Sequence, residues 1–474
     1  MKFKVIKIFI GLYITIFALP NSPALAALNG TSCNKLGKVQ TSSGLQFICS
    51  KNGKKLIWKQ IANSKKTQIN QPNKETGSTD TVKPPTTLEN STKLPTSSTI
   101  PGVIINTSSL SDYRPIGECK LQNNTQSQDV NLSHSPRNWR LINIDQTIRI
   151  LIFPVDFPDL ISPTSNSPDF SNLITKFEEF YKSQSGNKLK FNWTISPNYS
   201  RMLKTIESYG VGARASGSVW QLNYDIQDLA FQKYNINDFD FVIGSAPTTT
   251  TRGQIASSPA FGASDSRYRG ATYLGGDYWS NGTPWTIPAH EFGHFALGIA
   301  DLYNFEASML GQAGFEKQFQ HLGVYDIMNY AGGAGLEFTS WNRWIGNLIS
   351  DSQMLCQPDS STITRLKPIE EVNQNVKGLV IPISNSVRLV IENRSAKGFD
   401  SNLPSKAQGL IVYTVNNAIE SGYGPMQMVR KEGSTDIWYR DNALQVGDKL
   451  SYLGYTIKAL NKSGDDFFVE VSKE

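Results

Sequence analysis

Continuous apolar runs in the middle of the chain give way to alternating segments toward its end. Thr147–Val155 (TIRILIFPV) is apolar on consecutive positions, which predicts a strand buried on both faces. Phe170–Ser183 carries apolar residues at helical spacing, which predicts a helix. Asp238–Ile243 and Gly270–Leu274 are two further short apolar segments, which predict two more strands. The middle of the chain is therefore expected to mix strands with helices.

From about Leu379 onward the period of the apolar positions is two, which predicts strands and turns only. The expected strands lie in Gly378–Ile383, Val387–Glu392, Gly409–Val415, Lys449–Leu460 and Phe467–Ser472. The change of period near residue 360 predicts an α+β region over residues 113–357. An all-β, sandwich-like region is expected over residues 358–474.

The N-terminus has the three-part order of a signal peptide. Lysines within the first seven residues precede the apolar run Ile8–Leu19, and Ala24–Ala26 supplies the small residues typical of a cleavage site. The apolar run is shorter than the roughly 20 residues that a membrane-spanning helix needs. We therefore predict a signal peptide over residues 1–26, a secreted or cell-envelope-associated protein in an oxidising compartment, and no transmembrane anchor after cleavage.

The next two segments differ in composition. Residues 27–61 are rich in lysine, and their alternating apolar positions predict a small hairpin unit stapled by a disulfide between Cys33 and Cys49. Residues 62–112 lack aromatic residues and are rich in Ser, Thr, Asn and Pro, which predicts a disordered linker.

The basic charge of the chain is concentrated in these two segments. Residues 27–112 contain 11 lysines and 4 acidic residues, whereas the whole chain has a formal net charge of only +6. That total is too small to indicate nucleic-acid binding. The basic segment 27–61 could contact an anionic cell envelope loosely, or the whole arm could serve as a solvated spacer.

The strongest chemical signal is the run from His290 to His294 (HEFGH). Histidines four residues apart on a helix project from one face, so both imidazoles can bind one Zn²⁺. Glu291, next to the first histidine, can accept a proton from a water that the metal polarises.

The flanking residues support a helix over this run. Thr286 is the expected N-cap, Pro288 lies in the first turn, where its missing N–H is harmless, and Gly298 is the expected end. The pattern therefore predicts two zinc ligands and a general base on one helix.

The surrounding sequence resembles one known family. The run HEFGHFALGIADLYN is similar to the zinc segment of the immune inhibitor A-like secreted metallopeptidases, which usually reads H-E-F-G-H-x-x-G-x-x-D-x-Y. Further similar segments follow the family's order: SGNKL (Ser185–Leu189), GVYDIMNY (Gly323–Tyr330), SWNRWIGNL (Ser340–Leu348), and ENRSAKGFDSNLP (Glu392–Pro404) before GLIVY (Gly409–Tyr413). The resemblance begins near residue 145 and does not cover the N-terminal module or linker. It implies a metzincin-like zinc peptidase domain.

The same resemblance implies Asp301 as the third zinc ligand, with one departure from the family pattern. Gly298 and Asp301 lie four and seven residues after His294, where the family has three and six. On chemistry alone, the alternatives for this ligand are His321, Asp326 and Glu306.

Two residues near Asp326 also take expected roles from the resemblance. Met328 corresponds to the methionine of the turn that underlies the zinc, and its alternative is an ordinary core methionine. Tyr330 resembles a tyrosine that helps to stabilise the oxyanion, and its alternative is a buried aromatic residue with a paired hydroxyl.

The remaining cysteines and histidine are interpreted from their positions. Cys119 and Cys356 open and close the α+β region, and in an oxidising compartment a bridge between them is the simplest pairing. The alternative is a free Cys119 that blocks the zinc as a latency switch. His134 lies in a polar segment and is expected to be exposed.

These observations predict a secreted zinc-dependent endopeptidase that hydrolyses protein or peptide substrates, with Zn²⁺ as cofactor and Glu291 as general base. A structural Ca²⁺ is compatible with an exported protease, but no D-x-D-x-D-G loop places one. The alternative from another class is a catalytically degenerate cell-envelope-binding protein that acts through residues 27–61.

Overall fold

The computed structural model describes residues 39–42, 45–52, 55–60, 106–123, 130–134, 142–212, 219–251, 253–255, 267–275, 283–308 and 310–474. The expected signal peptide, Cys33 and residues 62–105 of the expected linker lie outside these residues. The chain divides into two compact units, Met1–Ser98 and Thr99–Glu474, and each is described by itself. Within the described ranges, no helix has the length and apolar composition needed to cross a membrane.

The first unit contains a small antiparallel sheet. Its strands β1 (Val39–Ser42), β2 (Leu45–Asn52) and β3 (Lys55–Gln60) pair in the order β1-β2-β3, so the expected hairpin unit has three strands. Cys49 is buried and disulfide-bonded, whereas its expected partner Cys33 lies outside the described residues. Lys51 and Lys55 are exposed.

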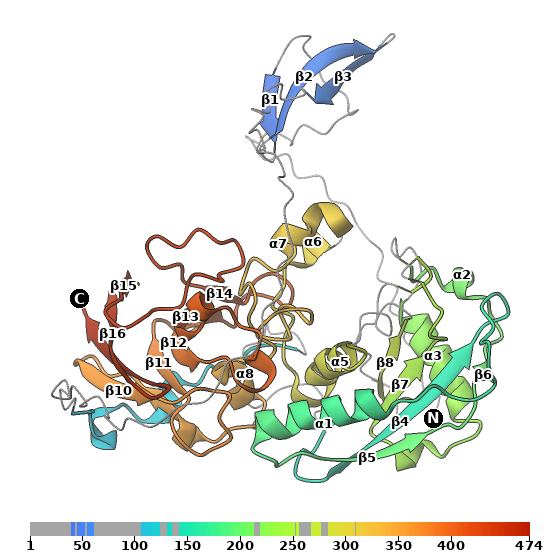
Figure 1. The fold of residues 1–474 in the computed structure, drawn as a ribbon, viewed down its shortest axis with the longest axis horizontal. Helices are drawn as coiled ribbons and strands as arrows, with labels where there is room; N and C mark the ends of the chain where they lie inside the picture. The colour runs from blue at the N-terminus through green and yellow to red at the C-terminus, as the bar shows by residue number, and fades with distance from the viewer. Residues whose placement is uncertain are drawn as a thin grey trace, which may run out of the picture. The chain divides into compact units, whose positions relative to one another are not determined.

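The second unit begins with a parallel sheet of order β5-β4-β7-β8 (Figure 1). Its strands are β4 (Thr147–Asp156), β5 (Lys190–Ile195), β7 (Phe241–Ser245) and β8 (Gly270–Leu274), and the short β6 (Ser200–Arg201) pairs with the end of β4. The strands predicted over Thr147–Val155 and Gly270–Leu274 are confirmed as β4 and β8, whereas the strand predicted over Asp238–Ile243 begins only at Phe241. A parallel sheet needs cover on both faces, which agrees with the unbroken apolar run of β4.

Helices cover both faces of this sheet. The side chains of Ile148, Ile150 and Ile152 join one hydrophobic cluster with residues of α1 (Ser171–Ser185) and α5 (Thr286–Leu297). The alternate β4 residues Leu151 and Phe153 join a second cluster with residues of α3 (Val219–Ala230). The helix predicted over Phe170–Ser183 is confirmed as α1.

The C-terminal region contains two antiparallel-rich sheets. The first has the order β14-β13-β12-β11-β9, and the second has the order β10-β17-β16-β15. The strands are β9 (Met354–Cys356), β10 (Thr362–Leu366), β11 (Gly378–Pro382), β12 (Val387–Arg394), β13 (Gly409–Asn416), β14 (Met426–Met428), β15 (Lys449–Tyr452), β16 (Tyr455–Ser463) and β17 (Asp466–Lys473). The α+β mixture with a C-terminal all-β region is therefore confirmed.

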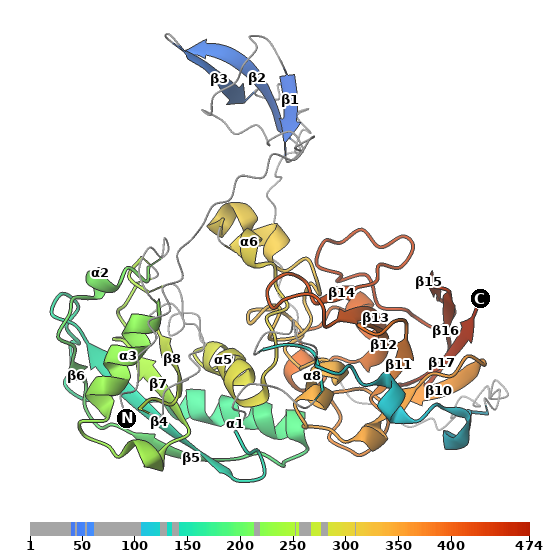
Figure 2. The ribbon, with the colours of Figure 1, turned by 180° about the vertical axis from the view of Figure 1, so that it is seen from behind.

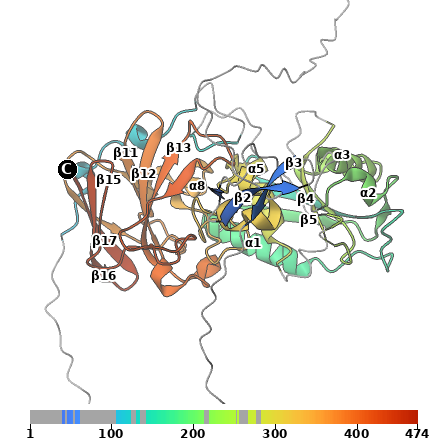
Figure 3. The same cartoon turned by 90° about the horizontal axis from the view of Figure 1, so that it is seen from above.

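The first of these sheets packs on both of its faces. Leu389 and Ile391 of β12 share a hydrophobic cluster with the second sheet, whereas Val390 joins the cluster that contains Trp341 of α8 (Ser340–Ile345). Three short α-helices complete the α-helices that the structure describes: α2 (Ile206–Tyr209), α6 (Phe305–Ser308) and α7 (Phe315–Gln318). Figure 2 and Figure 3 both place α5 and α8 between the parallel sheet and the C-terminal strands.

The expected boundary at residues 357 and 358 does not separate two compact units. Strand β9 precedes that boundary but pairs in parallel with β11 of the C-terminal sheet. Ser108, expected in the linker, donates a backbone hydrogen bond to the carbonyl of Ile363 at 2.9 Å. Residues on both sides of the predicted boundary therefore fold together.

The disulfide expected between Cys119 and Cys356 is confirmed, with 5.6 Å between the Cα atoms. The alternative of a free Cys119 that blocks the zinc is therefore wrong. The expectation for His134 is also wrong, because its side chain is buried and only 8% of the residue is exposed. Its ring packs edge-on against Trp341 and Trp344 of α8, and this tertiary contact overrides the polarity of the local sequence.

A buried charged network ties β12 to α8. The guanidinium of Arg394 lies 3.0 Å from the Glu392 carboxylate and 2.8 Å from the Asp400 carboxylate, and all three side chains are fully buried. Glu392 also accepts hydrogen bonds from the backbone N–H and hydroxyl of Ser340, both at 2.7 Å. Burial raises the pKa of Asp400 and of Glu370, although the charge of Arg394 opposes this shift.

Lys377 lies beside this network and leads to a prediction about pH. Its Nζ donates to the carbonyls of Pro368 (2.9 Å) and Glu371 (2.7 Å), and burial, aided by the charge of Arg343, lowers its pKa from 10.5 to about 8. Between these two pH values the unfolded chain binds more protons at Lys377 than the folded chain does. The contribution of Lys377 to stability therefore rises with pH across this window.

We expect Lys377→Met to remove this rise. Each pH unit between the two pKa values contributes up to about 1.4 kcal/mol. Raising the pH from 7.5 to 9.5 should therefore increase the unfolding free energy of the unmodified chain by about 2 kcal/mol more than that of the variant. Denaturant titrations of both chains at the two pH values measure this gain. The prediction is wrong if the two chains differ in unfolding free energy by the same amount at both pH values.

Candidate metal centre

Helix α5 carries the HExxH residues and ends where the sequence predicts. Gly298 adopts φ 64°, in the left-handed region that glycine tolerates, and its N–H caps the helix by donating to the carbonyls of Gly293 and His294. The N-cap is Trp285 rather than the expected Thr286, which is the first helical residue. Pro288 lies in the first turn, as predicted.

Met328 packs against α5 at Gly293. A Cβ atom at Gly293 would lie 3.1 Å from Sδ of Met328, so the glycine allows this close approach. Asp326 adopts φ 68° in the turn that leads to Met328. Its buried carboxylate accepts hydrogen bonds from the backbone N–H groups of Met328 (2.9 Å) and Thr339 (2.8 Å), which fix the turn.

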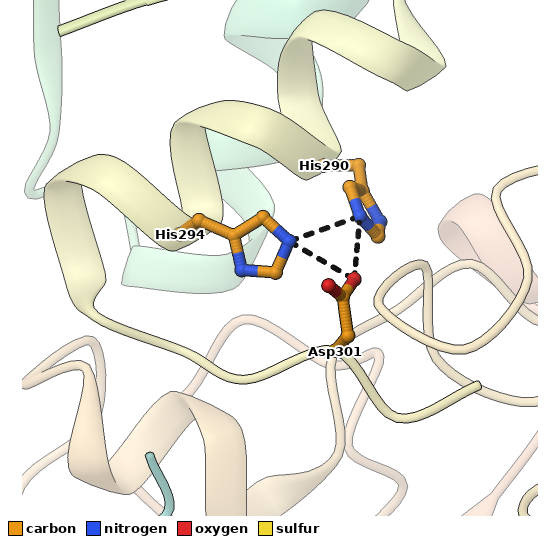
Figure 4. Close-up of side chains that lie close together, drawn as sticks. All are labelled: His290, His294 and Asp301. Atoms are coloured by element: carbon orange, nitrogen blue, oxygen red, sulfur yellow. Dashed lines mark hydrogen bonds and ion pairs between the residues drawn. The ribbon is translucent and has the colours of Figure 1, made fainter. Parts of the chain in front are cut away.

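The side chains of His290, His294 and Asp301 meet at one point (Figure 4). Oδ1 of Asp301 lies 3.1 Å from Nε2 of His290 and 3.0 Å from Nε2 of His294. The two Nε2 atoms are 3.1 Å apart. In the part of the chain that the structure describes, this is the one group of three histidine, cysteine or acidic side chains close enough to hold a metal ion.

Backbone carbonyls fix both imidazole rings. Nδ1 of His290 lies 2.9 Å from the carbonyl of Ile327, and Nδ1 of His294 lies 2.6 Å from the carbonyl of Ile299. A carbonyl only accepts hydrogen bonds, so each Nδ1 carries a proton, and Nε2 is the ring nitrogen that faces Asp301 and can bind a metal once it has lost its own proton. This is the arrangement that orients histidine ligands of metal sites.

Asp301 follows the end of α5 on a turn rather than on the helix. Gly298 reverses the chain, and Asp301 then returns to the histidines despite the one extra residue relative to the family pattern. Its backbone N–H donates to Oγ of Ser421 at 2.8 Å, and its carbonyl accepts from the N–H of Gly422 at 2.9 Å.

The other candidates for the third ligand lie elsewhere. Nδ1 of His321 pairs with the carbonyl of Leu302 at 2.9 Å, and its ring faces Gly424. The Asp326 carboxylate is occupied within its turn, and Glu306 is exposed on α6. Of the four alternatives, only Asp301 joins the two histidines.

Close contact between the three side chains shifts their pKa values. Burial lowers the pKa of His290, but the hydrogen bond to Asp301 and the charge of Glu291 outweigh it and raise the pKa overall. Burial would raise the pKa of Asp301, but the two histidines together hold it well below its ordinary value. The carboxylate and the imidazoles thus favour each other's charged forms, and a metal ion bound between them would take the place of a proton.

Glu291 is buried on α5 beside His290, with 8% of the residue exposed. Tyr330 is half-buried, and its ring stacks on Phe319 at a centroid distance of 4.0 Å. Its described ring contacts are with Phe319, Phe315 and Trp438 rather than with the three candidate ligands.

Two features near the site were missed in the sequence. The ring of Tyr303 lies 6.3 Å from that of His290, and its place two residues after Asp301 in the D-x-Y pattern was an available signal. The second is Ser421, which contacts Asp301 from 120 residues further along the chain. No local pattern marks this second contact.

The donor set fits a zinc ion. Three nitrogen and oxygen atoms about 3 Å apart leave a point about 2 Å from each of them, which is the usual Zn–ligand distance. Three protein ligands leave a fourth tetrahedral position for water or substrate, as catalytic zinc sites do. Comparison with models of known protein families matched none, and comparison with curated proteins found no similar sequence.

Proposed function

We propose that the protein is a secreted zinc-dependent endopeptidase with a metzincin-like catalytic region. The observation that carries the proposal is the convergence of His290, His294 and Asp301 beside the buried Glu291. The glycine-terminated helix and the methionine packed against it further support the metzincin-like assignment. The signal-peptide pattern of the first 26 residues supports secretion.

Each residue has a stated role in this proposal. His290, His294 and Asp301 would hold the zinc. The zinc would supply Lewis-acid polarisation of the scissile carbonyl and of the attacking water. Glu291 accepts the proton of that water and returns it to the leaving amine. Tyr330 is proposed to donate a hydrogen bond to the developing oxyanion.

The extra residue before Gly298 is the feature that would favour the catalytically degenerate alternative. The turn at Gly298 absorbs that residue, because Asp301 still reaches both histidines. The intact Glu291 also argues for the enzyme, because a structural zinc site has no need of this carboxylate. We therefore retain the enzyme as the single proposal.

The proposal predicts chelator-sensitive hydrolysis. The purified chain should cleave an unfolded protein such as casein, lose this activity with a zinc chelator, and regain it on addition of Zn²⁺. His294→Ala should lose both zinc and hydrolysis, because it removes one of three ligands.

His321→Ala is the matched control and should keep both properties, since His321 lies outside the candidate ligands. Bound zinc is measured by metal analysis of the purified chains. A chain that binds zinc but cleaves nothing would contradict the enzyme and favour the degenerate scaffold.

A further inference from the structure

The position of Asp301 depends on contacts outside its own helix. His290 and His294 are held by the regular backbone of α5, but Asp301 lies three residues beyond Gly298, the C-cap of this helix. Its backbone N–H and carbonyl therefore have no helical partners. Both groups bond instead to the loop over residues 417–425, which joins β13 to β14 in the C-terminal sheet.

This loop is itself fixed against the segment that follows Asp301. The N–H of Phe305 donates to the carbonyl of Gly422 at 2.8 Å, and Asn304 forms a bridge with Tyr423. Gly422 adopts φ 80°, and a Cβ atom there would lie 3.0 Å from Cβ of Phe305. The loop thus meets the chain on both sides of Leu302 and Tyr303 at close range.

Among the residues that the structure describes, Ser421 makes the one side-chain hydrogen bond to the Asp301 backbone. Its Oγ accepts from the Asp301 N–H at 2.8 Å, while the neighbouring Gly422 contact joins two backbone groups. Substitution at position 421 can therefore remove one anchor of Asp301 and leave the backbone contact in place. Ser421 itself is not among the candidate ligands.

From this geometry we infer that Ser421 is a positioning residue, which holds the Asp301 carboxylate in reach of the two histidines and thereby couples the C-terminal β region to metal affinity. The inference rests on the proposed zinc site. Groups that orient metal ligands typically account for a 10- to 100-fold change in affinity when they are removed. The effect of Ser421 should therefore appear in metal binding, independently of hydrolysis.

The test measures the zinc dissociation constant of the purified full chain by competition with a chromophoric chelator. Ser421→Ala should weaken zinc binding by about 10- to 100-fold, whereas Ser421→Thr, which keeps the acceptor oxygen, should bind nearly as the unmodified chain does. The unfolding transition of the metal-free chain, measured with excess chelator, should remain cooperative in both variants, which shows that both fold.

Two further variants keep the comparison decisive. Ser384→Ala is the matched control, because Ser384 Oγ also accepts backbone N–H bonds, from Ser386 and Val387, in a different loop of the same β region. It should leave zinc affinity unchanged. If Ser421→Ala does not fold, Ser421→Val replaces it, because valine has the shape of threonine without the acceptor.

The outcomes separate the two proposals. The positioning role is overturned if Ser421→Ala binds zinc as tightly as the unmodified chain does. It is also overturned if Ser421→Val binds zinc as tightly as Ser421→Thr does. Neither result argues against the zinc site itself. An equal loss of affinity in Ser384→Ala also overturns the positioning role, since the effect would not be specific to Asp301. If the unmodified chain binds no zinc, the proposed function fails first and the positioning role falls with it.

Discussion

Replacing Glu291 by glutamine should abolish most of the casein hydrolysis while the chain keeps its zinc. Glutamine has the size of glutamate but cannot accept the proton of the attacking water. A general base typically contributes about 10²- to 10⁴-fold to the rate, so we expect kcat to fall by that factor. Metal analysis of the same preparation should give the zinc content of the unmodified chain, because Glu291 is not one of the three candidate ligands.

Glu306→Gln provides the matched control for this experiment. Glu306 is an exposed glutamate on α6, only five residues after Asp301, and it was one of the alternatives for the third ligand. Its replacement should change neither zinc content nor kcat. Normal turnover in Glu291→Gln would rule out the assigned general base, and loss of zinc in Glu306→Gln would reopen the choice of third ligand.

Arg394→Met should be among the most destabilising single substitutions in the chain. Methionine fills a similar volume but leaves the buried carboxylates of Glu392 and Asp400 without their cation. Breaking a buried ion pair in this way typically costs about 3–5 kcal/mol of unfolding free energy. Denaturant unfolding of the variant and the unmodified chain at pH 7 measures this cost.

The loss of unfolding free energy in Arg394→Met should also depend on pH. Burial already raises the pKa of Asp400 and Glu370, and loss of the guanidinium removes the main opposing influence. Acids with a raised folded pKa stabilise the fold at low pH and lose that contribution as pH rises through the folded pKa. The penalty of Arg394→Met should therefore be smaller at pH 5 than at pH 8.

Arg440→Met serves as the control, since Arg440 pairs with Asp436 at 2.7 Å but keeps 49% of its side chain exposed. Exposed pairs contribute at most about 1 kcal/mol, so this variant should unfold nearly as the unmodified chain does. A similar small loss in Arg394→Met would mean that the buried network does not hold β12 to α8.

Local periodicity was enough to predict the elements that carry the site. The apolar run of β4, the spacing of α1 and the glycine that ends α5 each depend on residues a few positions apart, and all three predictions are confirmed. The prediction of Thr286 as N-cap is wrong, because Trp285 takes that position without a side-chain hydrogen bond. Capping preferences are averages over many helices and do not determine the N-cap of any one helix.

Contacts between distant parts of the chain could not be predicted in the same way. His134 is buried because α8 presents two tryptophans to it, and those residues lie more than 200 positions later. The carbonyls of Ile299 and Ile327 orient the imidazoles through backbone atoms, which no residue type identifies. For the third ligand, the extra residue left several candidates open, and only the geometry of the turn at Gly298 selects among them.

The distance along the chain between Asp301 and Ser421 also has a consequence for folding. A contact that spans 120 residues closes a large loop, and the entropy of that closure must be overcome before the contact contributes any stability. Contacts of this kind slow folding relative to local helix formation. Helix α5 depends mainly on local contacts, but we expect the three candidate ligands to reach their final arrangement only after the strands on either side of residues 417–425 have paired, because that loop anchors Asp301. We therefore expect the three candidate ligands to come together late in folding.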